Sequence, residues 1–302
     1  MLKEQDYIIL SSFKNGALIV RSLSFLGEQS RRELDVTGLS KEEMNQEIIA
    51  LYVLGAEEIK IFAKSIDQNQ RAAIRETLHL LIGLEIIEES ANTINVKNIL
   101  SSQKFSFRQS MEKMFLMTQS MFNDARTSLL ENNKKLAQDV LTRDVEVDKL
   151  YFLILRYGHT LLQGKVLEEE LGLTIEQSHY YENIATQLER IADHAVKIVS
   201  VVRSGKIIVK KRFKKLFGDT SSNLLQMLDD AARLTNDNPE RAGVRKLTNK
   251  IIGTKKDIDL LLKEAIESDF SETLIISDSV NRLQGYLINI AEALIDQSLA
   301  EK

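Results

Sequence analysis

Cysteine is absent from this 302-residue chain, and proline occurs once, at Pro239. Without cysteine, the chain can form neither a disulfide nor a thiolate metal or redox site. Because proline breaks helix interiors, its near absence permits many long helices. No apolar run approaches the roughly 18–20 residues that cross a bilayer, and no signal-peptide core follows the polar start of the chain. We therefore expect a mainly helical cytoplasmic protein without membrane insertion.

Neither sign of charge predominates in the sequence. Charged residues make up 28% of the sequence with both signs interspersed, and the net charge is −4. This composition describes a solvated surface rather than a disordered tail, and the 43% of hydrophobic residues suffices for a sizeable core. A net negative charge argues against a general nucleic-acid binder. The length allows one large domain or two to three modest ones.

Residues 1–103 have a mixed α/β pattern, and we expect them to form a small N-terminal domain. Two β-prone runs, 7–10 and 17–20, flank the turn signal at residues 14–16 and predict a hairpin. Ser40, with Glu43 three residues later, predicts the start of a helix. The elements expected after the hairpin are helices over residues 40–54 and 68–81 and strands over residues 59–63, 84–88 and 93–96.

From residue 106 onward the pattern is helical. Methionine and phenylalanine recur at helical spacing and predict a buried stripe, made by Met111, Met114, Phe115, Met121 and Phe122. Six helices are expected, over residues 106–131, 133–162, 174–203, 208–236, 240–268 and 271–298. Long helices with short connections favour bundles. A faint repeat between residues 189–199 and 281–291 supports two three-helix bundles, over residues 104–205 and 206–302.

Two acidic segments identify a family resemblance. Residues 143–150 (RDVEVDKL) look like the acidic motif on the second helix of a PhoU repeat. Residues 188–195 (LERIADHA) are similar to the signature on the third helix of that family. The resemblance implies a mainly α fold of two tandem PhoU-like bundles, the second one degenerate. It also implies a regulator of phosphate uptake.

The N-terminal part resembles one branch of the same family. Residues 48–56 and 81–89 look like the wing region of archaeal PhoU relatives, so residues 1–103 are interpreted as a small α/β wing. Many such relatives begin with an AbrB-like DNA-binding domain. Here only about 35 residues precede the part of the chain that carries the resemblance, and they have no evident basic arm, so we expect the chain to lack a complete AbrB-like domain. DNA binding is disfavoured on that ground.

The acidic segments also suggest a metal site. Asp144 and Asp148 are four residues apart, as are Glu189 and Asp193, so each pair lies on one helix face. If the two helices pack side by side, four carboxylates converge, and a cation relieves their repulsion. Oxygen ligands suit Mg²⁺ or Mn²⁺, and carboxylate clusters also hold iron. The resemblance implies multinuclear metal sites at these positions, with Zn²⁺ as a further candidate.

The alternative interpretation is a solvated acidic face. The same spacing occurs in three other acidic pairs, Glu43/Glu47, Glu85/Glu89 and Glu292/Asp296. In the second repeat, Asn281 and Gly285 replace the acidic residues of the third helix, so a second metal cluster is expected to be absent or weakened. We interpret His194, beside Asp193, as a structural histidine rather than a ligand.

A basic run lies near the junction of the two bundles. It consists of Lys210, Lys211, Arg212, Lys214 and Lys215. Such a run can dock an acidic partner surface, a phosphate-bearing ligand or nucleic acid, or it can simply be a solvated face.

No constellation of catalytic residues is present, so the chain is not expected to be an enzyme. The resemblance implies that it binds a phosphate transporter ATPase or a sensor kinase. A homodimer is a further possibility that the sequence does not decide. The first alternative is a DNA-associated transcriptional regulator, for which a salt-sensitive mobility shift with promoter DNA is the discriminating observation. The second is a metal-buffering helical protein.

Overall fold

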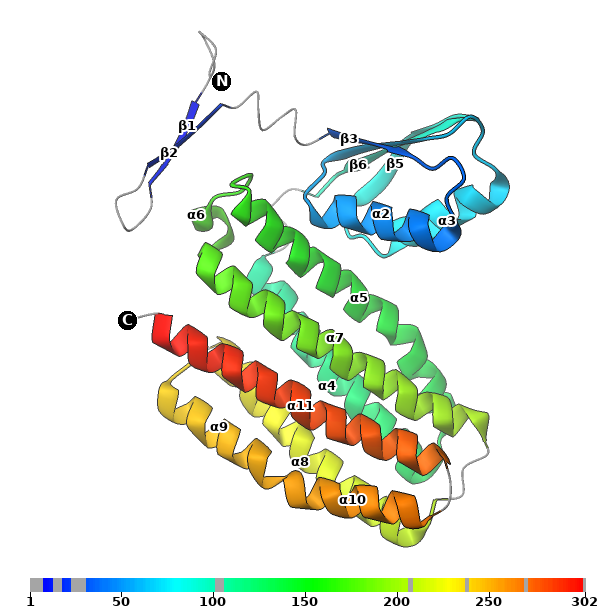
Figure 1. The fold of residues 1–302 in the computed structure, drawn as a ribbon, viewed down its shortest axis with the longest axis vertical. Helices are drawn as coiled ribbons and strands as arrows, with labels where there is room; N and C mark the ends of the chain where they lie inside the picture. The colour runs from blue at the N-terminus through cyan, green and yellow to red at the C-terminus, as the bar shows by residue number, and fades with distance from the viewer. Residues whose placement is uncertain are drawn as a thin grey trace. The chain divides into compact units, whose positions relative to one another are not determined.

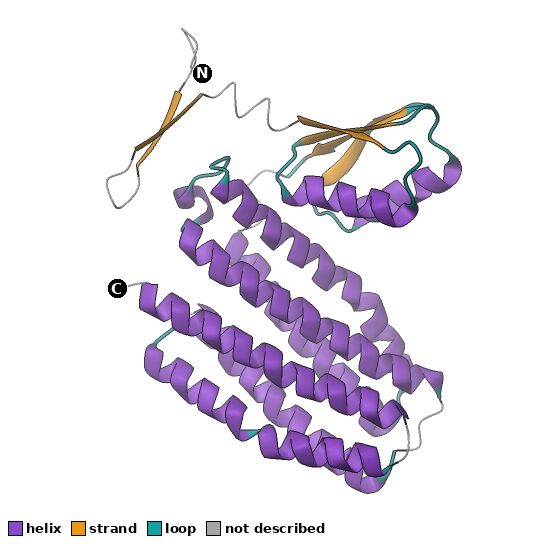
Figure 2. Cartoon of the chain, in the orientation of Figure 1, coloured by secondary structure: helices purple, strands orange, loops and turns teal. Residues whose placement is uncertain are grey.

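The protein is described by a computed structural model covering residues 8–12, 18–22, 31–100, 106–205, 209–236, 239–268 and 271–300. All its strands precede residue 99, and helices make up nearly all of the rest (Figure 2). The chain forms two compact units. Unit 1 contains Met1–Phe107 with Phe152–Ile175, and unit 2 contains Arg108–Tyr151 with Glu176–Lys302.

The expected hairpin is confirmed. Strands β1 (Ile8–Ser12) and β2 (Leu18–Ser22) form a two-stranded antiparallel sheet in which Leu10 lies opposite Val20. The turn expected at residues 14–16 lies outside the described residues.

A four-stranded sheet forms the rest of the wing, in the order β3-β4-β6-β5. Strands β3 (Arg31–Asp35) and β4 (Glu58–Phe62) are parallel, whereas β6 (Thr93–Asn98) runs antiparallel to both β4 and β5 (Leu84–Glu89). Strand β3 was not anticipated from the sequence, because only one of its five side chains, Leu34, is buried.

Helices α2 (Lys41–Val53) and α3 (Gln68–His79) cover one face of this sheet (Figure 1). As expected, Ser40 caps α2, and Glu43 returns the hydrogen bond in a capping box. Gly55 follows α2 with a φ of 78°, a left-handed conformation that glycine adopts without a steric cost. Side chains alternate along β4, so Ile59 and Ile61 enter the core between sheet and helices.

The first bundle consists of α4 (Phe107–Glu131), α5 (Lys134–Leu162) and α7 (Ile175–Ser204). The methionine and phenylalanine stripe of α4 is buried, as expected, with every one of the five side chains at most 1% exposed. A short helix not anticipated from the sequence, α6 (Glu168–Leu171), lies between α5 and α7 along the chain. The end of α5, together with α6, belongs to unit 1.

The second bundle consists of α8 (Lys211–Asn236), α9 (Arg241–Gly253), α10 (Lys255–Glu267) and α11 (Ser271–Ala300). The single helix expected over residues 240–268 was wrong, because the chain breaks at Thr254. The Thr254 hydroxyl donates to the Ile251 carbonyl at 2.7 Å, and the buried Gln284 amide donates to the same carbonyl at 2.9 Å. The pair α9–α10 thus takes the place of one helix of the bundle.

The expected mainly α fold, with a small α/β region before helical bundles, is confirmed. Apart from residues 152–175, which belong to unit 1, both bundles fall within unit 2. This division does not separate the two bundles, so the boundary expected between them at residue 205 stays a prediction. None of the helices in the described residues combines the length and apolar character that crossing a bilayer requires.

Candidate functional site

The four carboxylates predicted to bind metal lie on α5 and α7 in unit 2. Asp144 and Asp148 belong to α5, Glu189 and Asp193 belong to α7, and all four are half-buried. Burial raises the pKa of Asp144, and the charge of Asp193 on the other helix raises it further. The two helices thus bring the predicted pairs within electrostatic range of each other.

The pKa values of the other two carboxylates are raised further. Burial, followed by the charges of Asp144 and Asp193, raises the pKa of Asp148 to about 6. Burial, followed by the charges of Asp193 and Asp148, raises the pKa of Glu189 to about 7, although the neighbouring Arg190 opposes this. Burial and mutual repulsion thus disfavour the charged forms of these carboxylates, and a cation is suited to relieve the repulsion.

The chemistry of this donor set fits a hard cation, since all four donors are carboxylate oxygens. As the side chains are placed, however, the described residues contain no group of three or more histidine, aspartate or glutamate side chains that could hold a metal ion. The carboxylates act on one another through charge but do not form a ready ligand set. Metal binding at these residues stays a prediction.

His194 packs against α11. Its side chain is 5% exposed, and its Nε2 atom lies 3.3 Å from the Tyr286 hydroxyl of α11. Burial, followed by the charge of Lys197, lowers the pKa of His194 to about 4. The histidine is thus a neutral group packed between α7 and α11.

Part of the basic run stabilises the bundle itself. Lys214 donates to the Leu130 carbonyl at the end of α4 at 3.1 Å, and Lys210 donates to the Glu267 carbonyl at the end of α10 at 3.5 Å. Cations at helix C-termini offset the partial negative charge there. Arg212 pairs with the buried carboxylate of Glu264 at 3.2 Å. Lys211 and Lys215 are exposed and remain the better candidates for partner binding.

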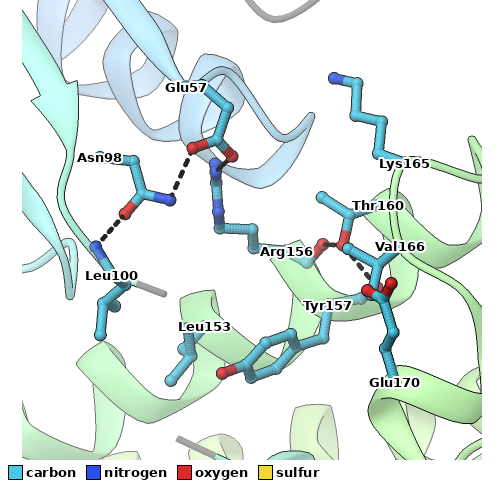
Figure 3. A pocket seen from close by; sticks show the side chains of 10 residues that line it. All are labelled: Glu57, Asn98, Leu100, Leu153, Arg156, Tyr157, Thr160, Lys165, Val166 and Glu170. Carbon is cyan, nitrogen blue, oxygen red and sulfur yellow. Dashed lines mark hydrogen bonds and ion pairs between the residues drawn. The ribbon is translucent and has the colours of Figure 1, made fainter. Parts of the chain in front are cut away.

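Unit 1 contains a cavity of about 320 Å³ that the sequence did not indicate (Figure 3). Its lining comes from the wing and from the α5–α6 segment, and consists of Glu57, Asn98, Leu100, Leu153, Arg156, Tyr157, Thr160, Lys165, Val166 and Glu170.

The two cations of this cavity are engaged by the end of α2. Arg156 is 5% exposed and donates to the carbonyls of Tyr52 at 2.6 Å and Ala56 at 3.0 Å. It also pairs with Glu57, as Figure 3 shows. Lys165 donates to the Gly55 carbonyl at 3.0 Å. Burial lowers the pKa of Lys165, as do the charges of Arg32 and Arg156. Because these two cations already bond to carbonyls at the end of α2, they are less available to bind an anion in the cavity.

A family model described as the PhoU domain matches residues 111–202. This segment of the chain is similar to a PhoU domain. The match contains all four carboxylates of the cluster, and it confirms the resemblance carried by residues 143–150 and 188–195. No curated protein matches the chain.

Solved structures support the same fold. The phosphate transport system regulatory protein PhoU from Streptococcus pneumoniae superposes with a TM-score of 0.55 at 17% identity, covering 64% of this chain and 94% of that one. PhoU from Pseudomonas aeruginosa gives a TM-score of 0.56 at 15% identity, covering 64% of this chain and 96% of that one. At these identities the likeness is one of fold.

Proposed function

We propose that this chain is a cytoplasmic regulator of phosphate uptake and cellular phosphate homeostasis, acting by binding rather than by catalysis. The observation that carries the proposal is the PhoU domain over residues 111–202. The fold shared with two PhoU proteins, one of them named as a phosphate transport system regulator, adds support. On this proposal the partner is a phosphate transporter ATPase or a sensor kinase.

The docking surface we favour includes the exposed lysines at the start of α8. Lys211 and Lys215 lie four residues apart and are both exposed. Their neighbours Lys210, Arg212 and Lys214 bond within the chain and hold this end of the bundle. The two lysines thus lie at a helix start that their neighbours hold in place. Their positive charges suit an acidic partner surface.

Affinity purification from phosphate-replete and phosphate-starved cells tests the regulatory proposal. We expect a phosphate-transport ATPase or its sensor to co-purify, with a recovery that depends on phosphate. The double variant K211E/K215E should lower recovery at least tenfold, since it reverses two charges at the surface. The matched control K246E/K256E makes the same charge change at exposed lysines elsewhere in the second bundle. Absence of every transport component under both conditions would refute the proposal.

We also propose that the carboxylate cluster holds a hard divalent or trivalent cation. Asp144 and Asp148 would supply ligands from α5, and Glu189 and Asp193 from α7. The bound cation would neutralise their mutual repulsion and tie the two helices together.

Metal analysis of the purified protein tests the cluster separately. The double variant D148A/D193A should lose the metal retained by the native chain. The matched control E292A/D296A removes an acidic pair of the same spacing from the exposed face of α11 and should retain it. Equal metal content in D148A/D193A and the native chain would contradict this assignment and would not affect the regulatory proposal.

A further inference from the structure

The ends of α4, α7 and α10 meet the starts of α5, α8 and α11 at one end of unit 2 (Figure 1). Lys214 and Lys210 of α8 donate to carbonyls in the last turns of α4 and α10. Lys134 of α5 lies against Gly205 at the end of α7, and the Thr273 hydroxyl of α11 donates to an α10 carbonyl at 3.3 Å. Segments far apart in the sequence therefore form one continuous surface here.

This surface carries an excess of positive charge. Besides the cations already engaged there, five are exposed and form no ion pair with a described residue, and we call them the basic end: Lys134, Lys135, Arg203, Lys211 and Lys215. The carboxylates that are exposed or half-buried at the same helix ends are fewer: Glu131, Glu267 and Glu272. Positive charge is thus concentrated at one end of a chain whose net charge is −4.

Exposed aliphatic side chains adjoin the basic end. Ile266, in the last turn of α10, is 69% exposed, and Leu274 and Ile275, in the first turn of α11, are 43% and 45% exposed. Lys210 bonds to the carbonyl of the residue that follows Ile266, so the aliphatic and basic groups belong to one surface. The phenylalanine side chains described at this end, Phe213 and Phe217, are fully buried.

The basic end is distant along the helices from the points where the chain passes between the two units. These passages follow Phe107, Tyr151 and Ile175. At 1.5 Å per residue, α4 and α7 run for about 35 Å and about 42 Å from a passage to the basic end, and about 26 Å of α5 separates Lys134 from the third. The surface is therefore built from unit 2 alone.

We propose that this end of unit 2 docks on the surface of a bilayer that contains anionic phospholipid, without any helix crossing it. The cations of the basic end would meet lipid phosphates, and the three aliphatic side chains would enter the boundary between head groups and acyl chains. Lys211 and Lys215 also belong to the proposed protein-docking surface, whereas the other three cations do not. The inference needs no protein partner.

The combination of side chains favours lipid over other anionic partners. Proteins that hold single-stranded nucleic acid add stacking aromatics to their cations, and protein interfaces centre on buried aromatic or arginine anchors. The described residues of this end expose lysine, arginine and aliphatic groups but no aromatic ring. A bilayer surface needs only charge and short apolar side chains, spread over an area rather than gathered in a pocket.

Cosedimentation of the purified full chain with protein-free vesicles tests the proposal. We expect binding to vesicles of phosphatidylglycerol and phosphatidylcholine but not to phosphatidylcholine alone. Raising the salt from about 0.1 M to about 1 M should weaken binding at least tenfold, because the screening length falls from about 10 Å to about 3 Å.

Charge reversal at the basic end gives the sharper test. The variant K134E/K135E should bind anionic vesicles at least tenfold more weakly, since one basic residue at such a surface strengthens binding about fivefold. Glutamate is favourable in the first turn of a helix, so this variant should fold, which circular dichroism checks. The matched control K246E/K256E reverses two exposed lysines elsewhere in the second bundle and should bind as the native chain does.

A second pair of variants tests the aliphatic contribution. I266S/L274S should weaken vesicle binding at least threefold, because it removes apolar area that enters the bilayer boundary. I252S/L260S changes side chains with similar exposed fractions, 58% and 48%, away from this end and should not.

Failure of the native chain to bind anionic vesicles, or equal binding by K134E/K135E, would overturn the inference. If K134E/K135E instead lowered only the recovery of a protein partner, the surface would take an acidic protein and the lipid assignment would be wrong. Because the vesicles contain no protein, neither result depends on the proposed role in phosphate uptake.

Discussion

Half-burial of Asp148 and Glu189 makes the stability of the bundle sensitive to pH. Their pKa values are raised to about 6 and about 7, whereas unfolded carboxyls titrate near 4. Between these limits the folded chain binds more protons than the unfolded chain, so stability falls as the pH rises. The destabilisation is fully present above the folded pKa values and is relieved as the pH drops through them.

This argument predicts the effect of neutralising the carboxylates. With a metal chelator present, the midpoint of thermal unfolding should rise when the pH is lowered from 8 to 6. The variant D148N/E189Q should be more stable than the native chain at pH 8, by on the order of 1 kcal/mol per residue, and should show a flatter pH dependence. Circular dichroism melts at several pH values measure both. An equally steep dependence in the variant and in the exposed control D296N would contradict the account.

At the scale of elements, the break between α9 and α10 depends on one side chain of α11. Gln284 is 6% exposed and donates to both the Ile251 carbonyl and the Thr254 hydroxyl at 2.9 Å. Helix ends leave carbonyls without helical donors, and a buried one is costly unless it is paired. Gln284 therefore stabilises a helix end inside the bundle.

Replacing Gln284 by leucine should lower the free energy of unfolding by about 1–3 kcal/mol, since the buried Thr254 hydroxyl loses its donor and the Ile251 carbonyl loses one of the hydrogen bonds that it accepts. Urea denaturation with the variant Q284L measures the change. Q226L makes the same substitution at an exposed position of α8 and should stay within about 0.5 kcal/mol of the native chain. Equal stabilities for the two variants would show that the bridge contributes nothing.

At the scale of the whole molecule, unit 1 is assembled from distant parts of the chain. Its wing comes from the first 107 residues, and residues 152–175 join it from between the two parts of unit 2. The carbonyls at the end of α2 receive hydrogen bonds from Arg156, about one hundred residues away along the sequence. The wing is thus not independent of the helical part of the chain.

Replacing Arg156 by methionine should destabilise the wing rather than unit 2. It removes a buried cation that bonds two carbonyls near the end of α2, and it removes the ion-pair partner of Glu57. Amide hydrogens of residues 41–62 should exchange at least tenfold faster, which corresponds to ~1.4 kcal/mol. The control K149M removes an ion pair within α5 and should leave this exchange unchanged. Equal exchange rates of these amide hydrogens in R156M and in the native chain would contradict the prediction.

Local patterns determined much of what the sequence alone could predict. Helix periodicity and end signals depend on residues within one or two turns, so the helices of the first bundle, the Ser40 cap and the buried methionine stripe followed directly from the sequence. The spacing of Asp144 and Asp148, and of Glu189 and Asp193, likewise predicted two acidic helix faces. These features need no knowledge of what packs against them.

Tertiary structure decided the features that join residues far apart in the chain. Strand β3 owes its place to pairing with β4, and the break at Thr254 is bridged by Gln284 from another helix. The shift in the pKa of Asp148 arises from burial, from the charge of Asp144 and from the charge of Asp193 on α7. Burial and long-range contacts arise only when the chain is folded, so no local pattern encodes them.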